Sequence, residues 1–264
     1  MTRFLTALAT VVAAALPATG HEFWFEAESY QIGSGQQIVA RTFNGEDFEG
    51  LELSYSGREY ERSGIVGPVG DSKLFGTNGD RPAISSRPQG DGLHVVWHRS
   101  PIANINYPTM EKFTTFLTNQ RLDAALEEHS ARGFPTENIK EIYFRYVKLL
   151  MAVGEATGED QPLGMTYELV AVDNPYTTQG STRFKVLGRG VPQPGVPTYA
   201  FHKAPDGTVE KLLFETDGDG VFEVPKRDGS FMINAVQIVP APASINEATG
   251  AVWVTLWASL TYGD

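Results

Sequence analysis

The chain has 264 residues, contains no cysteine and carries a formal net charge of −11. So acidic a surface argues against nucleic acid and anionic membrane as partners, because both are themselves negatively charged. The missing thiols exclude a disulfide scaffold and any thiolate site, so a metal ion would need histidine, carboxylate, backbone or water ligands.

The first twenty residues have the composition of a cleaved secretion signal. Arg3 precedes an apolar run over residues 4–16, and the small residues Ala18 and Gly20 come directly before His21. The run is too short to span a bilayer, so we expect cleavage after Gly20. We therefore expect a secreted, periplasmic protein whose mature part has no membrane span.

Cleavage at that point would make His21 the first residue of the mature chain. A terminal histidine offers its α-amino nitrogen and an imidazole nitrogen together, which is a bidentate grip on a divalent metal ion. The alternative is that the cleavage site precedes a histidine by chance. Both interpretations stay open, as does the identity of the ion among Ni, Co, Cu and Zn.

Short alternating segments and glycine-rich turns predict strands from residue 21 to about residue 99, notably at 38–43, 51–55 and 93–98. His94 and His98 fall four residues apart in the last of these, a distance of about 13 Å along a strand. At most one of them could therefore join His21 at a metal ion. The alternative for each is an ordinary hydrogen-bonded histidine.

Six acidic residues lie near the expected mature terminus: Glu22, Glu26, Glu28, Glu46, Asp47 and Glu49. If the terminal segment is a strand, Glu22 and Glu26 point to the face opposite His21. They are then poor partners for it. The number of carboxylates is normal for an acidic surface.

Residues 110–153 change to helical periodicity and predict a helical hairpin. Phe113, Phe116 and Leu117 recur at helical spacing in the first half. In the second half, one apolar stripe predicts a helix over residues 139–150, made of Ile139, Ile142, Tyr143, Tyr146, Val147 and Leu150. His129, at the end of the first helix, is expected to be solvated.

Strand signals return from about residue 167 and end in an alternating segment at residues 252–260. We expect a mainly β chain of two immunoglobulin- or prealbumin-like sandwich domains, residues 21–165 and 166–264, with the hairpin attached to the first. Trp253 and Trp257 share the second face of the last strand. They would form either a sugar-stacking platform, together with Trp24, or part of a core.

Several separated motifs together resemble the secreted bacterial domain-of-unknown-function family 4198. They are residues 21–24 (HEFW), 143–148 (YFRYVK), 174–176 (NPY), 216–220 (TDGDG) and 257–262 (WASLTY). The resemblance implies a periplasmic protein associated with nickel or cobalt uptake, and it places the family's terminal histidine at His21. Where relatives carry a late histidine, this chain has Gln237. Arg145 and Lys148 match the family's helix motif, and they would be either surface ion-pair residues or a docking site for a membrane partner.

The leading hypothesis is a binding protein, not an enzyme, that captures a divalent transition metal at His21 with His98 or His94, completed by carboxylates or water. A membrane metal-uptake component would receive the ion. One alternative is a non-catalytic envelope interaction or carbohydrate-binding module. A further alternative is a histidine-brace copper protein, which needs a second histidine close to His21.

Overall fold

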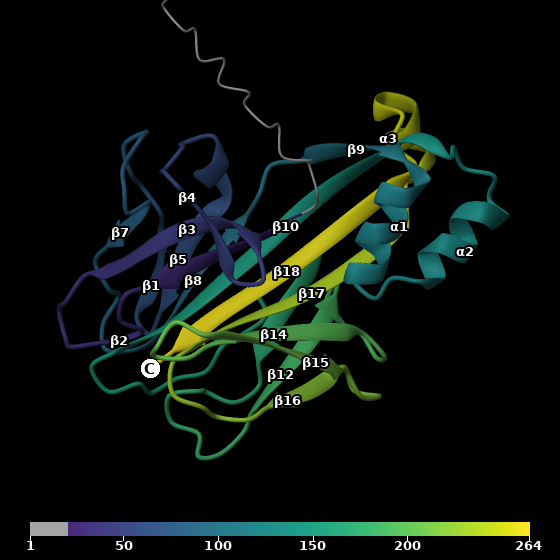
Figure 1. Cartoon of the computed structure of the whole chain (residues 1–264). Helices are drawn as coiled ribbons and strands as arrows, with labels where there is room; N and C mark the ends of the chain where they lie inside the picture. The colour runs from purple at the N-terminus through teal and green to yellow at the C-terminus, as the bar shows by residue number, and fades with distance from the viewer. Residues whose placement is uncertain (1–20) are drawn as a thin grey trace, which may run out of the picture.

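The computed structural model describes residues 21–264, so the predicted signal segment at residues 1–20 lies outside the described residues. The described part is mostly β, with strands gathered in several sheets and three α-helices (Figure 1). The predicted mainly β fold class is therefore confirmed.

The first half of the chain supplies ten strands and two helices: β1 (Glu22–Ala27), β2 (Gln31–Ile32), β3 (Ile38–Glu46), β4 (Glu49–Leu53), β5 (Ser63–Gly67), β6 (Gly70–Lys73), β7 (Ile84–Ser86), β8 (Gly92–Arg99), β9 (Ala103–Thr109), α1 (Met110–Asn119), α2 (Ala124–Ala131) and β10 (Glu137–Val153). A short 3₁₀ turn, η1, covers Glu59–Arg62.

The second half supplies β11 (Tyr167–Ala171), β12 (Thr182–Gly188), β13 (Val191–Pro192), β14 (Pro197–Lys203), β15 (Val209–Glu215), β16 (Val221–Val224), β17 (Ser230–Pro240), α3 (Ala243–Thr249) and β18 (Trp253–Gly263). The predicted strand at the end of the chain is β18, and the 216–220 segment is the turn between β15 and β16.

A ten-stranded sheet runs through the middle of the molecule in the order β15-β14-β17-β18-β10-β8-β5-β6, with β2 and β9 also paired to β10. The long strands β10 and β18 lie side by side at its centre and pair in parallel (Figure 1). This sheet contains strands from both predicted domains, residues 21–165 and 166–264.

Smaller sheets cover the two faces of the central sheet. The sheet of β1, β3, β4 and β7 packs on one face through a core that includes Phe25, Ile38 and Val147. The sheet of β11, β12, β13 and β16 packs on the other through a core that includes Phe184, Leu150 and Leu260. Helices α1 and α2 cover one end of the first face.

The predicted helix over residues 139–150 is wrong, because this segment is the central strand β10. Ile142 and Leu150 point to one face of the strand, while Val147 and Leu149 point to the other. Both faces are covered, so apolar residues occupy odd and even positions alike. That pattern includes the i, i+3 and i+4 spacing typical of a helix, although the segment is a strand.

The first half of the predicted hairpin is helical, but it forms two helices instead of one. Thr109 caps α1 by accepting a hydrogen bond from the backbone nitrogen of Lys112. Phe113, Phe116 and Leu117, predicted as one helical face, pack together on Trp253 and Trp257 of β18. The helices therefore cover an apolar end of the central sheet.

Candidate functional site

The described chain begins beside the edge of the β1–β3 pair, where His21 meets Glu46. The antiparallel register sets Glu22 opposite Gly45, so continuing it by one residue brings His21 opposite Glu46. Side chains directly opposite one another in such a pair lie on the same face. His21 Nδ1 accordingly lies 3.1 Å from Glu46 Oε1, and the two side chains are 30% and 57% exposed.

A tight hairpin holds Glu46 in this position. Asp47 and Phe48 connect β3 to β4, and both have positive φ angles, of 52° and 64°. Two consecutive residues with positive φ form a tight hairpin turn whose twist matches that of the flanking strands. The Phe48 ring is fully buried against Trp24, so packing fixes the turn despite its unfavourable backbone.

Arg145 of β10 holds the backbone of His21. Its Nη2 donates to the His21 carbonyl oxygen at 3.1 Å and to Asn44 Oδ1 at 3.0 Å. The guanidinium also lies over the rings of Tyr143 and Phe23. A planar cation stacked on two aromatic rings therefore ties the first described residue to β3 and β10 through one nitrogen.

Glu22 points to the opposite face, as the sequence predicted. Its side chain is buried, and burial raises the pKa of its carboxyl to about 7 against the opposing effect of Lys211. A carboxyl on the far side of the strand is not placed to share an ion with His21.

His94 lies in β8, as predicted, and both of its ring nitrogens have partners. Nδ1 donates to the Gly92 carbonyl at 3.0 Å, and Nε2 accepts from the Gln89 backbone nitrogen at 2.8 Å. Burial lowers the pKa of this imidazole, which favours its neutral form. These contacts match the alternative of an ordinary hydrogen-bonded histidine.

His98 lies in the same strand and is also fully buried. Its Nδ1 pairs with the Ser63 hydroxyl at 3.0 Å, and Nε2 donates to Glu59 at 3.2 Å. The ring stacks on Phe23, which comes from the same strand face as His21. A metal ion could bind His98 only by displacing one of these hydrogen-bond partners.

The expectation that His129 is solvated is wrong, because the side chain is buried between α2 and β18. Its Nδ1 accepts from the Trp253 indole nitrogen at 3.0 Å, and its Nε2 donates to the Pro135 carbonyl at 2.9 Å. Gln237, where relatives are expected to carry histidine, lies in β17 and donates to the Gln193 side chain at 3.3 Å.

The three tryptophans considered for ligand stacking are covered. Trp24 and Trp253 are fully buried and Trp257 is 3% exposed. Trp24 packs on Phe43 and Phe48, while Trp253 and Trp257 lie beneath the helices. A sugar-stacking platform needs an exposed ring face, so these side chains form cores instead.

Arg145 and Lys148 are not one helical turn apart, because both belong to strand β10. Lys148 is only 1% exposed and binds Asp160 and Glu168. Neither residue therefore offers an exposed cationic surface to a docking partner.

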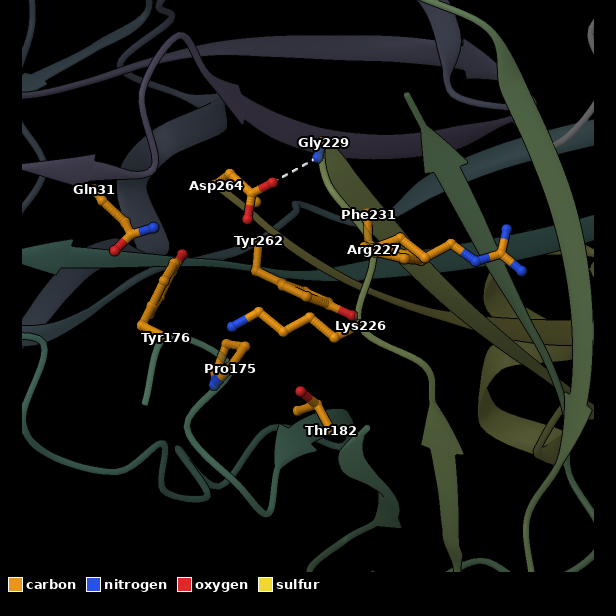
Figure 2. A pocket seen from close by; sticks show the side chains of 11 residues that line it. Gln31, Pro175, Tyr176, Thr182, Lys226, Arg227, Gly229, Phe231, Tyr262 and Asp264 are labelled. Carbon is orange, nitrogen blue, oxygen red and sulfur yellow. Dashed lines mark hydrogen bonds between the residues drawn. The ribbon is translucent and has the colours of Figure 1, made fainter. Parts of the chain in front are cut away.

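One hollow lies near His21 and another lies away from it. A cleft of about 390 Å³ lies beside Arg145 and is lined by Phe23, Thr42, Asn44, Ser56, Glu59 and Arg81 among others. A second cavity, at the far end of β18 beside Tyr176, Lys226 and Asp264, measures only about 30 Å³ (Figure 2). It is large enough for about one water molecule.

Side chains alone do not form a metal site in residues 21–264, since no group of three or more His, Asp or Glu could hold an ion there. No helix within the same residues is long and apolar enough to cross a membrane. The His21–Glu46 pair supplies two donors, so an ion at this place would need a third from the backbone or from water.

The sequence did not single out Glu46 from the six nearby acidic residues. The signal that selects it is the strand register, which depends on the turn at Asp47 and Phe48. Neither turn residue is glycine or asparagine, the usual markers of such a hairpin.

Comparison with known proteins agrees with the resemblance seen in the sequence. The family described as "Domain of unknown function (DUF4198)" matches residues 18–238. No curated protein matches the chain. A crystal structure of Salmonella alpha-2-macroglobulin reacted with methylamine is 13% identical over 94% of this chain and 15% of that chain, with a TM-score of 0.21, which is too low to support an argument about fold or function.

Proposed function

This chain belongs to the DUF4198 family, and from that premise we propose that it binds a divalent transition-metal ion at an amino terminus created by cleavage before His21. The observation that carries the proposal is the 3.1 Å separation of His21 Nδ1 and Glu46 Oε1. Two donors each about 2.1 Å from one ion stand about 3 Å apart when they meet it near a right angle. The spacing of this pair therefore suits a shared ion.

The α-amino nitrogen of His21 would be the third donor. Cleavage after Gly20 would free this nitrogen, and with Nδ1 of the same residue it would form a chelate ring on the ion. Because no three side chains in residues 21–264 form a site by themselves, affinity would depend on that cleavage. Uncleaved protein would bind weakly, which ties metal capture to arrival outside the cytoplasm.

The remaining positions on the ion would be filled by water. The exposed fractions of His21 and Glu46 leave the site open to solvent, so the ion can enter and leave without a large conformational change. An exchangeable site suits an accessory protein that captures nickel, cobalt or a similar ion in the periplasm and passes it to a membrane uptake component. No chemical step is required of the protein.

Calorimetric titration with nickel, cobalt, copper and zinc tests this proposal. The chain beginning at His21 should bind one ion with micromolar or better affinity. A chain with one alanine added before His21 keeps every side chain and should lose at least a hundredfold in affinity. Equal affinity in the two chains would exclude the terminal chelate, and absence of binding to the first would overturn the metal function.

Substitution Glu46→Gln measures the contribution of the carboxylate to metal affinity separately from that of the terminal histidine. We expect about a tenfold loss in affinity, the size found when one supporting group of a metal site is removed. Glu28→Gln is the matched control, because it removes the same charge from an exposed carboxylate that is already paired with Arg41. A loss of the same size in both variants would mean that only net charge matters.

A further inference from the structure

A lysine and two carboxylates are buried together away from the amino-terminal site. Lys148 Nζ of β10 lies 3.1 Å and 3.3 Å from the two carboxylate oxygens of Asp160 and 2.8 Å from Glu168 Oε1. All three side chains are at most 2% exposed. Asp160 comes from the loop before β11, and Glu168 lies in β11.

The two carboxylates are held differently by the backbone. Glu168 accepts hydrogen bonds from the backbone nitrogens of Leu163, at 2.6 Å, and Met165, at 3.1 Å. Asp160 accepts one backbone hydrogen bond, from Ala171 at 2.9 Å. Glu168 is therefore fixed by two backbone donors and Asp160 by one.

The two carboxylates share one buried ammonium group, which also donates to the Gln161 carbonyl at 3.1 Å. Burial raises the pKa of Asp160 in spite of the lysine beside it. Moving a proton from Lys148 to Asp160 would keep the net charge of the group unchanged and replace two buried ions by a neutral amine and a carboxylic acid.

The geometry also places the two partners side by side. Nζ of Lys148 contacts both oxygens of the Asp160 carboxyl group at almost equal distances, 3.1 Å and 3.3 Å. A short movement of the lysine side chain would bring Nζ over the carboxyl carbon, which is the approach that attack requires. The Ala171 amide points at one carboxyl oxygen, where negative charge would build up during attack.

We propose that Lys148 and Asp160 condense into an intramolecular amide bond, with Glu168 as the base. The lone pair of neutral Nζ attacks the carboxyl carbon of protonated Asp160. Glu168 takes a proton from Nζ and returns it to the departing hydroxyl. One C–N bond forms, one C–O bond breaks, and one water molecule leaves, so no oxidant or cofactor is needed.

Such a bond would fasten the loop between β10 and β11 to the central strand of the molecule. The chain has no cysteine, so it lacks the usual covalent reinforcement of secreted proteins. An amide buried in a core resists both reducing agents and hydrolysis. The link does not depend on His21, so its presence or absence leaves the metal proposal unaffected.

Tryptic digestion of the fully denatured protein, followed by mass spectrometry, tests the bond directly. Trypsin needs a free lysine side chain, and no other lysine or arginine lies between Tyr146 and Arg183. The linked chain should give one uncut peptide of residues 146–183, lighter than its sequence mass by one water. Cleavage after Lys148 into unmodified 146–148 and 149–183 would show an ion pair only and overturn the proposal.

A dehydrated 149–183 peptide would also overturn it, because that result means cyclisation of Asp160 alone. Glu168→Gln should leave residues 146–148 and 149–183 separable, while Lys and Asp remain in place. Asp160→Asn keeps the shape of the side chain and should reach the same linked peptide by losing ammonia. A linked Asp160→Asn chain with an unlinked Glu168→Gln chain would establish both the bond and its base.

Discussion

The indole nitrogen of Trp253 donates a 3.0 Å hydrogen bond to Nδ1 of His129, joining the last strand to the second helix. Both side chains are buried, and Phe113 and Phe134 pack around them. The other ring nitrogen of His129, Nε2, donates a hydrogen bond to the Pro135 carbonyl oxygen. The histidine is thus a fully satisfied member of a core.

Trp253→Phe should lower the free energy of unfolding by about 1–3 kcal/mol beyond the loss of packing, because it leaves Nδ1 of His129 buried without a donor. Urea unfolding measures the change. The double variant His129→Phe/Trp253→Phe removes both partners and should cost less than the sum of the single variants. Additive costs would show that the hydrogen bond contributes nothing.

Glu141 makes stability fall as pH rises. Burial raises its pKa to about 8, although the Tyr107 hydroxyl donates a hydrogen bond to the carboxyl at 3.3 Å. The unfolded chain releases this proton near the ordinary glutamate pKa, so the folded state loses relative stability as pH rises from about 4.5 to about 8. Glu141→Gln should therefore be more stable than the parent chain at pH 9, on the order of 2–4 kcal/mol.

Unfolding measured at pH 5 and pH 9 checks this prediction. The advantage of Glu141→Gln should shrink markedly at the lower pH. Glu137→Gln is the matched control, because Glu137 lies on the same strand but is exposed. The prediction fails if the two variants respond to pH alike.

Arg145→Lys should weaken metal binding at the amino terminus about tenfold, if the proposed function holds. A lysine keeps the charge, but it lacks the planar guanidinium that lies over Phe23 and Tyr143 and so holds Nη2 between the His21 carbonyl and Asn44. The backbone of His21 would then lose its fixed direction toward Glu46. Calorimetry of the chain beginning at His21 measures the effect, and unchanged affinity would show that Arg145 does not position the terminus.

Phe48→Ala should destabilise the fold by about 3–5 kcal/mol, as expected for truncation of a buried aromatic side chain. The ring is fully buried, so the loss exceeds any relief of its positive φ angle. Because Phe48 also anchors the turn that carries Glu46, the variant should bind metal less tightly even where it remains folded. Thermal unfolding with and without nickel measures both effects, and an unchanged melting temperature would contradict the first.

The sequence was most informative where aliphatic residues alternate with other residue types along a segment. The alternating end segment and the His94–His98 strand were predicted, and they appear as β18 and β8, although both strands are buried along almost their whole length. β10 was mistaken for a helix, because its apolar residues occupy odd and even positions and include the i, i+3 and i+4 spacing of a helix. Local pattern does not report how many layers cover a segment.

The candidate site was less predictable than the fold. His21 stood out because of its position beside the expected cleavage point, but its neighbour Glu46 is set by pairing between strands. The partners of His129 and Lys148 come from β18, β11 and the loop before it, far along the chain. Such long-range contacts produce no periodic pattern in the sequence around His129 or Lys148, so the sequence could not predict them.

The parallel pairing of β10 with β18 makes closure of the central sheet a long-range event. β18 is the last strand of the described residues, yet it stands in the middle of the central sheet between β17 and β10. Parallel partners cannot be joined by a tight hairpin, so no local contact brings β10 and β18 together. The two halves of the sheet can therefore join only through this long-range pairing, and such pairings form slowly during folding.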